Sequence, residues 1–212
     1  MTKKPKQKSA WNKGKTVGRK PALVSTQVTA IKTVMAERSL LRDRAMFAVA
    51  IDSCLRGCDL LRLRVHDVML SGEMRDQVRV QPMKTKQQAN SAIVFEPSRD
   101  TQKLLQRHIE AGDLLSTDYL FTSIRPPTGP RKPLSERAYL KLVNKWVAFA
   151  GLNPEIYGTH SIRRARPALI YRKTGNIRAC QIMLGHKTIA STQLYLGVEE
   201  EETLDLARQF EM

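Results

Sequence analysis

Apolar residues recur at helical spacing along most of the chain. Behind Ser25, which we expect to cap the first helix, Val28, Ile31 and Val34 repeat at three-residue intervals. The same kind of spacing predicts further helices over residues 40–55, 59–64, 98–111, 135–150, 161–173, 177–184, 189–196 and 200–210. Gly57 marks the break between the second and third of these helices. The pattern therefore predicts a mainly helical protein.

Two short runs break the helical pattern. Residues 78–80 (Val-Arg-Val) and 92–95 (Ala-Ile-Val-Phe) are typical of strands, and the polar stretch 83–91 separates them. This arrangement predicts a β-hairpin with a long loop that carries Lys84 and Lys86. The predicted fold class is thus mainly α with a small antiparallel β-sheet.

The chain divides into three parts by composition. A length of 212 residues favours one well-buried domain, which we expect over residues 25–199. Residues 1–24 are rich in Lys, Gly, Pro and Gln, and we expect a flexible basic arm because they offer little apolar surface to bury. Residues 200–212 are acidic and include the apolar residues Leu204, Leu206, Ala207 and Phe210, which predicts a short terminal helix.

The formal net charge of +16 is the strongest compositional signal. Residues 1–20 hold eight Lys and Arg and no acid, but residues 21–198 also carry a large basic excess. A basic excess within the folded part indicates a polyanionic partner such as double-stranded DNA. The alternative is a basic protein kept in solution by its charge.

Other classes of function find no support. No apolar run approaches the length that would span a bilayer, and the basic N-terminus lacks the apolar stretch of an export signal. We therefore expect a cytoplasmic, nucleoid-associated protein without a membrane partner. Cys54, Cys58 and Cys180 make an odd count without a CxxC pair. A metal site from Cys54, Cys58 and His66 would be an alternative, but we predict no metal and no cofactor.

Four residues near the C-terminus stand at informative distances. They are His160 and Arg163 in Gly-Thr-His-Ser-Ile-Arg (158–163), His186 in Leu-Gly-His (184–186), and Tyr195, nine residues beyond His186. Each alone has an ordinary explanation: a solvated Arg, a core Tyr, or a helix end with glycine in a left-handed conformation. Together they resemble the second signature box of the tyrosine recombinase (phage integrase) family.

A second segment supports the resemblance. Residues 55–63 (Leu-Arg-Gly-Cys-Asp-Leu-Leu-Arg-Leu) are similar to the family's first box, with Arg56 on a tight turn and an acid three residues later. Lys84 stands where the family places its catalytic lysine. The resemblance covers about residues 40–200 and implies a tyrosine recombinase catalytic-domain fold.

The chemistry of phosphoryl transfer explains part of this set. Negative charge grows on the phosphate oxygens in the transition state, and the guanidinium groups of Arg56 and Arg163 can neutralise it with bidentate hydrogen bonds. His186 would donate a further hydrogen bond to the phosphate. Such a site requires no metal.

The remaining residues would move protons and form the covalent bond. A free Tyr has a pKa of about 10, so Tyr195 must lose its proton to a neighbour as it attacks. His160 is the candidate base or orienting group. The resemblance assigns Lys84 as the acid that protonates the departing 5′-oxygen.

The sequence departs from the family pattern at two places. Family members usually carry His after the second-box Arg, whereas here Arg164, Arg166 and Pro167 follow. Pro167 falls where it would shift the helix start. We expect three nearby or loop cations to contact DNA, namely Arg164, Arg166 and Lys86. The chain also has only about 25 residues ahead of the domain, similar to catalytic-domain-only members such as bacterial DNA-inversion recombinases.

These patterns predict a site-specific recombinase that cuts and rejoins DNA through a 3′-phosphotyrosyl bond. Alternatives are a type IB topoisomerase-like nicking and closing enzyme and a DNA-binding regulator without catalysis. The resemblance implies a tetramer on two DNA sites, in which the segment 200–212 docks on a neighbouring protomer or on its own domain. The target site, the outcome (integration, excision or inversion) and accessory proteins have no signal in the sequence.

Overall fold

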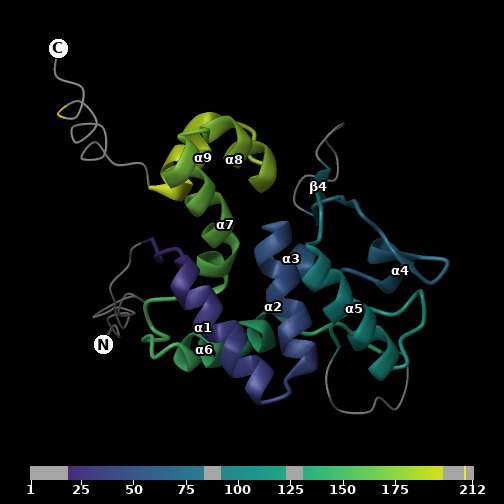
Figure 1. Cartoon of the computed structure of the whole chain (residues 1–212). Helices are drawn as coiled ribbons and strands as arrows, with labels where there is room; N and C mark the ends of the chain where they lie inside the picture. The colour runs from purple at the N-terminus through teal and green to yellow at the C-terminus, as the bar shows by residue number, and fades with distance from the viewer. Residues whose placement is uncertain (1–18, 84–91, 123–130, 198–207, 209–212) are drawn as a thin grey trace, which may run out of the picture.

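The computed structural model describes residues 19–83, 92–122, 131–197 and 208. Within that part it is mainly helical with two small antiparallel sheets, which confirms the predicted fold class (Figure 1). The helices are α1 (Ser25–Glu37), α2 (Leu41–Ser53), α3 (Gly57–Leu60), α4 (Val65–Val68), α5 (Arg99–Ala111), α6 (Glu136–Phe149), α7 (Thr159–Thr174), α8 (Ile177–Leu184) and α9 (Ile189–Leu196). The strands are β1 (Met69–Leu70), β2 (Glu73–Met74), β3 (Val78–Val80) and β4 (Ile93–Phe95).

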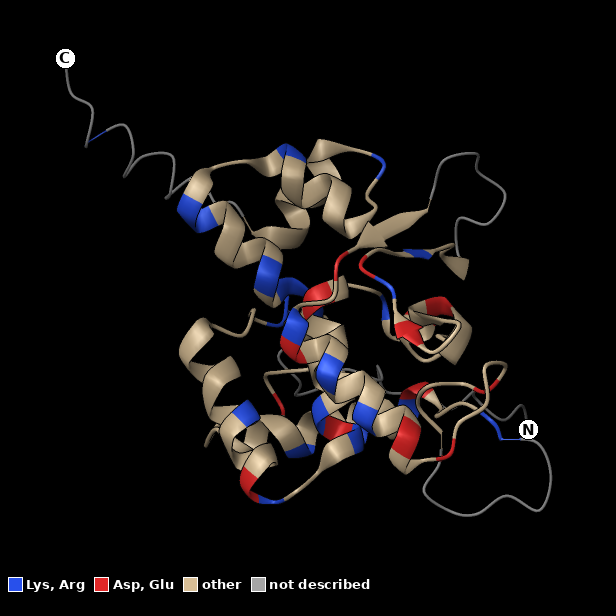
Figure 2. Ribbon diagram, turned by 45° about the vertical axis from the view of Figure 1, so that its right-hand side comes forward, with Lys and Arg blue, Asp and Glu red and all other residues tan. Residues whose placement is uncertain are grey.

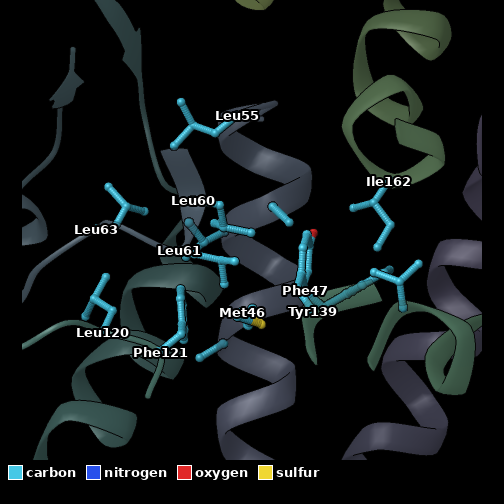
Figure 3. Close-up of a cluster of buried hydrophobic side chains, with 14 of the residues drawn as sticks. Met46, Phe47, Leu55, Leu60, Leu61, Leu63, Leu120, Phe121, Tyr139 and Ile162 are labelled. Carbon is cyan, nitrogen blue, oxygen red and sulfur yellow. The ribbon is translucent and has the colours of Figure 1, made fainter. Parts of the chain in front are cut away.

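Helix α2 forms the centre of the core. It packs against α1, α5 and α7, and its side chains Met46 and Phe47 are fully buried among residues of α3, α6 and the 120–121 segment (Figure 3). The Phe47 ring meets Trp146 of α6 edge-on, with 5.7 Å between ring centres. The indole nitrogen of Trp146 donates to the buried carboxylate of Asp43 at 3.0 Å, so the polar atom of this large side chain is satisfied.

Helices α7, α8 and α9 form the upper part of the molecule in Figure 1 and pack on one another. Strand β4 packs on α8 because Gly185 ends that helix in the left-handed conformation, with φ of +60°. A Cβ atom at Gly185 would lie 2.9 Å from the Ile93 side chain. Glycine is therefore required at this position for two reasons, the left-handed backbone turn and the close approach of β4.

Some predicted elements need correction. Ser25 is the first residue of α1 rather than its cap, because the Gln27 side chain accepts the backbone N–H of Val24 at 3.0 Å and closes the helix start. The helix expected over residues 59–64 is the shorter α3, which begins at Gly57. The break before α3 lies at Cys54, which takes a left-handed conformation at the end of α2.

The basic arm also needs a new boundary. The structure packs its last residues on the body, because Leu23 is 1% exposed and its N–H donates to the Ser161 carbonyl. The Lys20 ammonium donates to the carbonyls of Glu155 and Tyr157 at 2.8 and 2.7 Å. Residues 19–24 are thus held at the start of α7, while residues 1–18 lie outside the described part.

Several other expectations also fall outside the described residues. These are Lys84 and Lys86 in the loop between β3 and β4, and the terminal segment 200–212 apart from Arg208. Among the helices in the described ranges, none is long and apolar enough to cross a membrane.

Candidate active site

Arg163 connects the two motif segments of the site. It is 4% exposed, and its Nε donates to the Cys54 carbonyl at 2.8 Å while Nη2 donates to the Leu184 carbonyl at 2.7 Å. Both acceptors stand at C-terminal helix ends, where carbonyls lack partners within the helix and carry partial negative charge. One guanidinium thereby fixes the end of α2 beside Arg56 and the end of α8 beside His186.

The structure brings His160 and Tyr195 together from opposite ends of the motif. His160 lies in the first turn of α7 and Tyr195 in the last turn of α9, and Nδ1 of His160 is 3.2 Å from the tyrosine hydroxyl. This is hydrogen-bonding distance for a group that accepts the phenol proton. The arrangement fits a base and a nucleophile.

His186 also contacts the tyrosine ring. Its ring meets that of Tyr195 edge-on at 5.1 Å, and its Nδ1 is 3.1 Å from the hydroxyl of Thr192, the one buried residue of α9. Burial lowers the pKa of His186 from 6.5 to about 4, and the charges of Arg163 and Arg56 add to this effect. The imidazole is therefore neutral at pH 7 in the absence of a phosphate.

The low pKa of His186 predicts a loss of stability in acid. The unfolded chain binds a proton on this residue near pH 6.5, whereas the folded protein binds it only near pH 4. The stabilising contribution is complete above pH 6.5 and is lost as the pH falls toward 4. Between pH 7 and pH 4, the free energy of unfolding measured in urea should fall less for His186→Gln than for the wild type. Equal losses in the variant and the wild type would contradict the prediction. The control is His66→Gln, because the side chain of His66 on α4 is exposed.

Tyr195 is held neutral in the free protein. Burial raises the pKa of its phenol, and the charges of Arg163 and Arg164 oppose that shift. The Arg163 and Arg164 guanidinium carbons lie 5.3 and 4.4 Å from the ring centre. An attack by this hydroxyl would therefore need a proton acceptor, and the contact to His160 agrees with that requirement.

Arg56 presents an unused donor to the site. Its Nη1 is buried, and no residue in the described part accepts a hydrogen bond from it. A buried cationic donor without a partner is costly unless a ligand completes it, and an anionic phosphate oxygen is the natural acceptor. The nearby carboxylate of Asp59 is 3% exposed and accepts the backbone N–H of Met83 at 2.9 Å. It thereby fixes the described end of the hairpin loop just before Lys84.

The two extra arginines are engaged within the protein. Arg164 is 4% exposed and donates to the Lys20 carbonyl, while Arg166 donates to the Asp52 carbonyl at 3.0 Å and pairs with its carboxylate. Contact of either with DNA stays a prediction. Pro167 lies inside α7, which begins at Thr159, so the proline does not move the helix start. It leaves the Arg163 carbonyl without its usual helical donor.

Charge on the three upper helices is of one sign. Residues 159–196 contain seven Lys and Arg and no Asp or Glu. Figure 2 shows blue segments without red ones on these helices, while both colours alternate in the body below. The surroundings of Tyr195 therefore favour an anionic substrate.

No metal site is formed by the three residues considered above as alternative ligands, Cys54, Cys58 and His66. In the described ranges, no group of three or more His, Cys, Asp or Glu is arranged to hold a metal ion. Cys54 is buried, and burial raises the pKa of its thiol to about 12. A neutral buried thiol is a packing residue rather than a ligand.

Sequence reasoning missed three contacts of the site. Thr192, which orients His186, has no motif that distinguishes it from other helical threonines. The carbonyls of Cys54 and Leu184 that bind Arg163 are backbone atoms, so only the positions of the helix ends could indicate them.

Comparison with known proteins gives consistent relatives. The Phage integrase family matches residues 22–202. The chain is 29% identical to the probable integrase/recombinase YoeC of Bacillus subtilis (strain 168) over 76% of its own length and 81% of that relative. It is 26% identical to the tyrosine recombinase XerD of Xanthomonas axonopodis pv. citri (strain 306), over 76% of this chain and 52% of XerD. The chain thus spans about half the length of that recombinase.

Solved structures share the fold. The XerH site-specific recombinase in a post-cleavage complex with its difH substrate superposes with a TM-score of 0.69 at 17% identity, over 90% of this chain and 53% of XerH. The Tn1549 transposon integrase in complex with transposon right end DNA has a TM-score of 0.68 at 13% identity, over 93% and 68% of the two chains. With the family match over most of its length, the chain belongs to the phage integrase family.

Proposed function

We propose that this protein is a site-specific DNA recombinase that cuts and rejoins strands through a 3′-phosphotyrosyl intermediate. The observation that carries the proposal is the hydroxyl of Tyr195, 3.2 Å from His160, on a ring that lies against Arg163 and His186 and feels the charge of Arg56. DNA complexes and recombinase names among the relatives support double-stranded DNA as the substrate.

The reaction follows from the residues present. The Tyr195 oxygen attacks the phosphorus as its proton passes to His160, and the bond from phosphorus to the 5′-oxygen breaks. Arg56 and Arg163 stabilise the charge on the phosphoryl oxygens, with a hydrogen bond from His186. The ester retains the energy of the broken bond, so a 5′-hydroxyl of another strand can reverse the step and release the tyrosine without ATP.

Lys84 is proposed to protonate the departing 5′-oxygen. Lys84→Ala should slow cleavage of an ordinary phosphodiester by roughly 10²- to 10⁴-fold, the usual contribution of a general acid. A substrate with sulfur at the 5′-bridging position has a leaving group that needs no proton, and it should restore the rate. The measurement is the single-turnover rate of covalent adduct formation with each substrate.

The neighbouring Lys86 is the matched control for this test. Lys86→Ala removes a charge from the same loop and should give the same loss, if any, with both substrates. Sulfur rescue of Lys86→Ala in place of Lys84→Ala would assign the acid to Lys86, and absence of rescue in both would contradict a lysine acid.

The proposed function is tested with a plasmid that carries two copies of the DNA flanking the gene. A site-specific recombinase should exchange the segments, giving deletion or inversion according to their orientation. Relaxation of supercoiled plasmid without any such site would favour the topoisomerase-like alternative. Binding without either product would favour a regulator, although the intact residue set argues against it.

We also propose how the protomers assemble on DNA. Recombination between two sites requires four protomers, and we propose a tetramer in which the segment 200–212 docks on a neighbouring protomer. The acidic character of that segment supports a destination on a basic protein surface, since DNA would repel it. The basic residues 1–18 are proposed to contact the phosphate backbone.

A further inference from the structure

Arg164 is an unusual arginine. It follows Arg163 directly on a basic helix, yet only 4% of its surface is exposed. Burial of a guanidinium is unfavourable and lowers the pKa of Arg164, and its Nε lacks an acceptor in the described part of the chain. A residue that merely supplied charge to DNA would gain by pointing outward, so the buried position calls for another reason.

The face of the Tyr195 ring provides that reason. The Arg164 guanidinium carbon lies 4.4 Å from the ring centre, nearer than that of Arg163 at 5.3 Å. A cation over an aromatic face is attracted by the ring's quadrupole, most strongly where water is excluded. The ring is thus held on its face by Arg164, at its hydroxyl by His160, and edge-on by His186.

Helix α9 packs on α7 and α8 but buries few of its own side chains. Within its eight residues only Thr192 is buried, while Leu194 is 80% exposed. Helices of this length need tertiary contacts to hold them in place. The contacts of the Tyr195 ring therefore add to the packing that positions its hydroxyl.

Arg164 is itself held by the segment before α1. Its Nη1 donates to the Lys20 carbonyl, and the Lys20 ammonium bonds the carbonyls of Glu155 and Tyr157 ahead of α7. The neighbouring Arg19 donates to the Leu194 carbonyl of α9 at 3.2 Å. This segment thereby connects the start of α7 to the helix that carries the nucleophile.

We propose that Arg164 is a positioning residue that holds the Tyr195 ring in the attacking orientation and keeps a positive charge at its face. The proposal rests on the proposed role of Tyr195 as nucleophile. The same charge favours the phenolate and so opposes the effect of burial on the Tyr195 pKa. Arg164 thus acts through Tyr195, whereas Arg56 and Arg163 face the phosphate.

The test compares Arg164→Met, which keeps a long apolar stem without charge, with Arg164→Lys, which keeps the charge. The rate of adduct formation on a nicked suicide substrate is measured from pH 6 to 9.5. At pH 7 the Met variant should be about 10- to 30-fold slower than wild type, with Lys intermediate. The deficit should stay constant over this range, because the phenol pKa of Tyr195 is raised above its ordinary value of about 10 and the phenolate fraction of each protein rises in parallel.

The matched control is Arg64→Met. The guanidinium carbon of Arg64 lies 4.1 Å from the centre of the Tyr119 ring, so this variant removes a similar contact away from the site. It should keep the wild-type rate at every pH. An equal loss in Arg164→Lys and Arg164→Met, or no loss in either variant, would overturn the proposal. If Arg164→Met does not fold, the rate of Arg164→Lys is compared with that of the wild type. A lower rate supports the proposal, and an unchanged rate overturns it.

A second measurement is independent of DNA cleavage. Tyrosinate absorbance is titrated in wild type, Arg164→Lys and Arg164→Met, each with and without Tyr195→Phe, so that the difference reports Tyr195 alone. The midpoint should rise in the Met variant, and an unchanged midpoint would count against the charge at the ring face. A wild type that titrates as expected but forms no DNA adduct would refute the proposed function and leave the contact of Arg164 with Tyr195 standing.

Discussion

Tyr195→Phe should abolish covalent attachment to DNA, with a loss of more than about 10³-fold in adduct formation. The substitution removes the attacking oxygen and its contact with His160 but keeps the ring that Arg164 and His186 contact. DNA affinity should therefore change little. The measurement is denaturing gel electrophoresis of protein incubated with a labelled, nicked substrate.

Tyr119→Phe is the matched control for that experiment. It removes a phenol that accepts a hydrogen bond from Arg64 at 3.0 Å, away from the site. This variant should form the adduct at the wild-type rate. An adduct of undiminished yield in Tyr195→Phe would show that another residue attacks the phosphate.

Arg56→Met should slow cleavage by about 10²- to 10³-fold without lowering the stability of the free protein. The loss in rate follows from removal of a donor to the transition-state phosphate. Stability is maintained because no described residue accepts a hydrogen bond from the buried Nη1, so its removal breaks no such bond. Single-turnover cleavage and urea unfolding measure the two quantities.

Arg163→Met is the informative comparison. It breaks two buried bonds to the Cys54 and Leu184 carbonyls, each worth about 1.5–3 kcal/mol for a charged donor. Arg163→Met should therefore lose both activity and stability. If Arg56→Met destabilises the protein as much as Arg163→Met while cleaving at the wild-type rate, the assignment of Arg56 to the phosphate is wrong.

The sequence predicted best the long helices with a clear apolar period. The helices expected over residues 98–111 and 135–150 are α5 and α6, and the structure adds that the side chains of Ser98 and Ser135 cap them by accepting the N–H groups of Thr101 and Ala138. The β1–β2 hairpin was missed, since each strand has only two residues and alternation over so short a run has no statistical weight. Its Ser71-Gly72 turn, with positive φ at both residues, was the one available signal.

The proximity of the motif residues was predictable, but their arrangement was less so. The spacing of His160, Arg163, His186 and Tyr195 indicated a common site through the family resemblance, and the structure brings the four together. The contact of Arg164 with the Tyr195 ring could not be foreseen. Helix periodicity places it beside Arg163 but cannot show that α9 folds back to lay a tyrosine ring against it.

The central claim is that Tyr195 becomes joined to a 3′-phosphate of DNA. It is tested most directly by trapping wild-type protein on a nicked suicide substrate, digesting the complex with nuclease and protease, and sequencing the modified peptide by mass spectrometry. The proposed chemistry predicts one phosphotyrosyl peptide, carrying nucleotide at Tyr195 through the 3′ end of the cleaved strand. Attachment at another residue, attachment to a 5′-phosphate, or cleavage without a covalent adduct would contradict it.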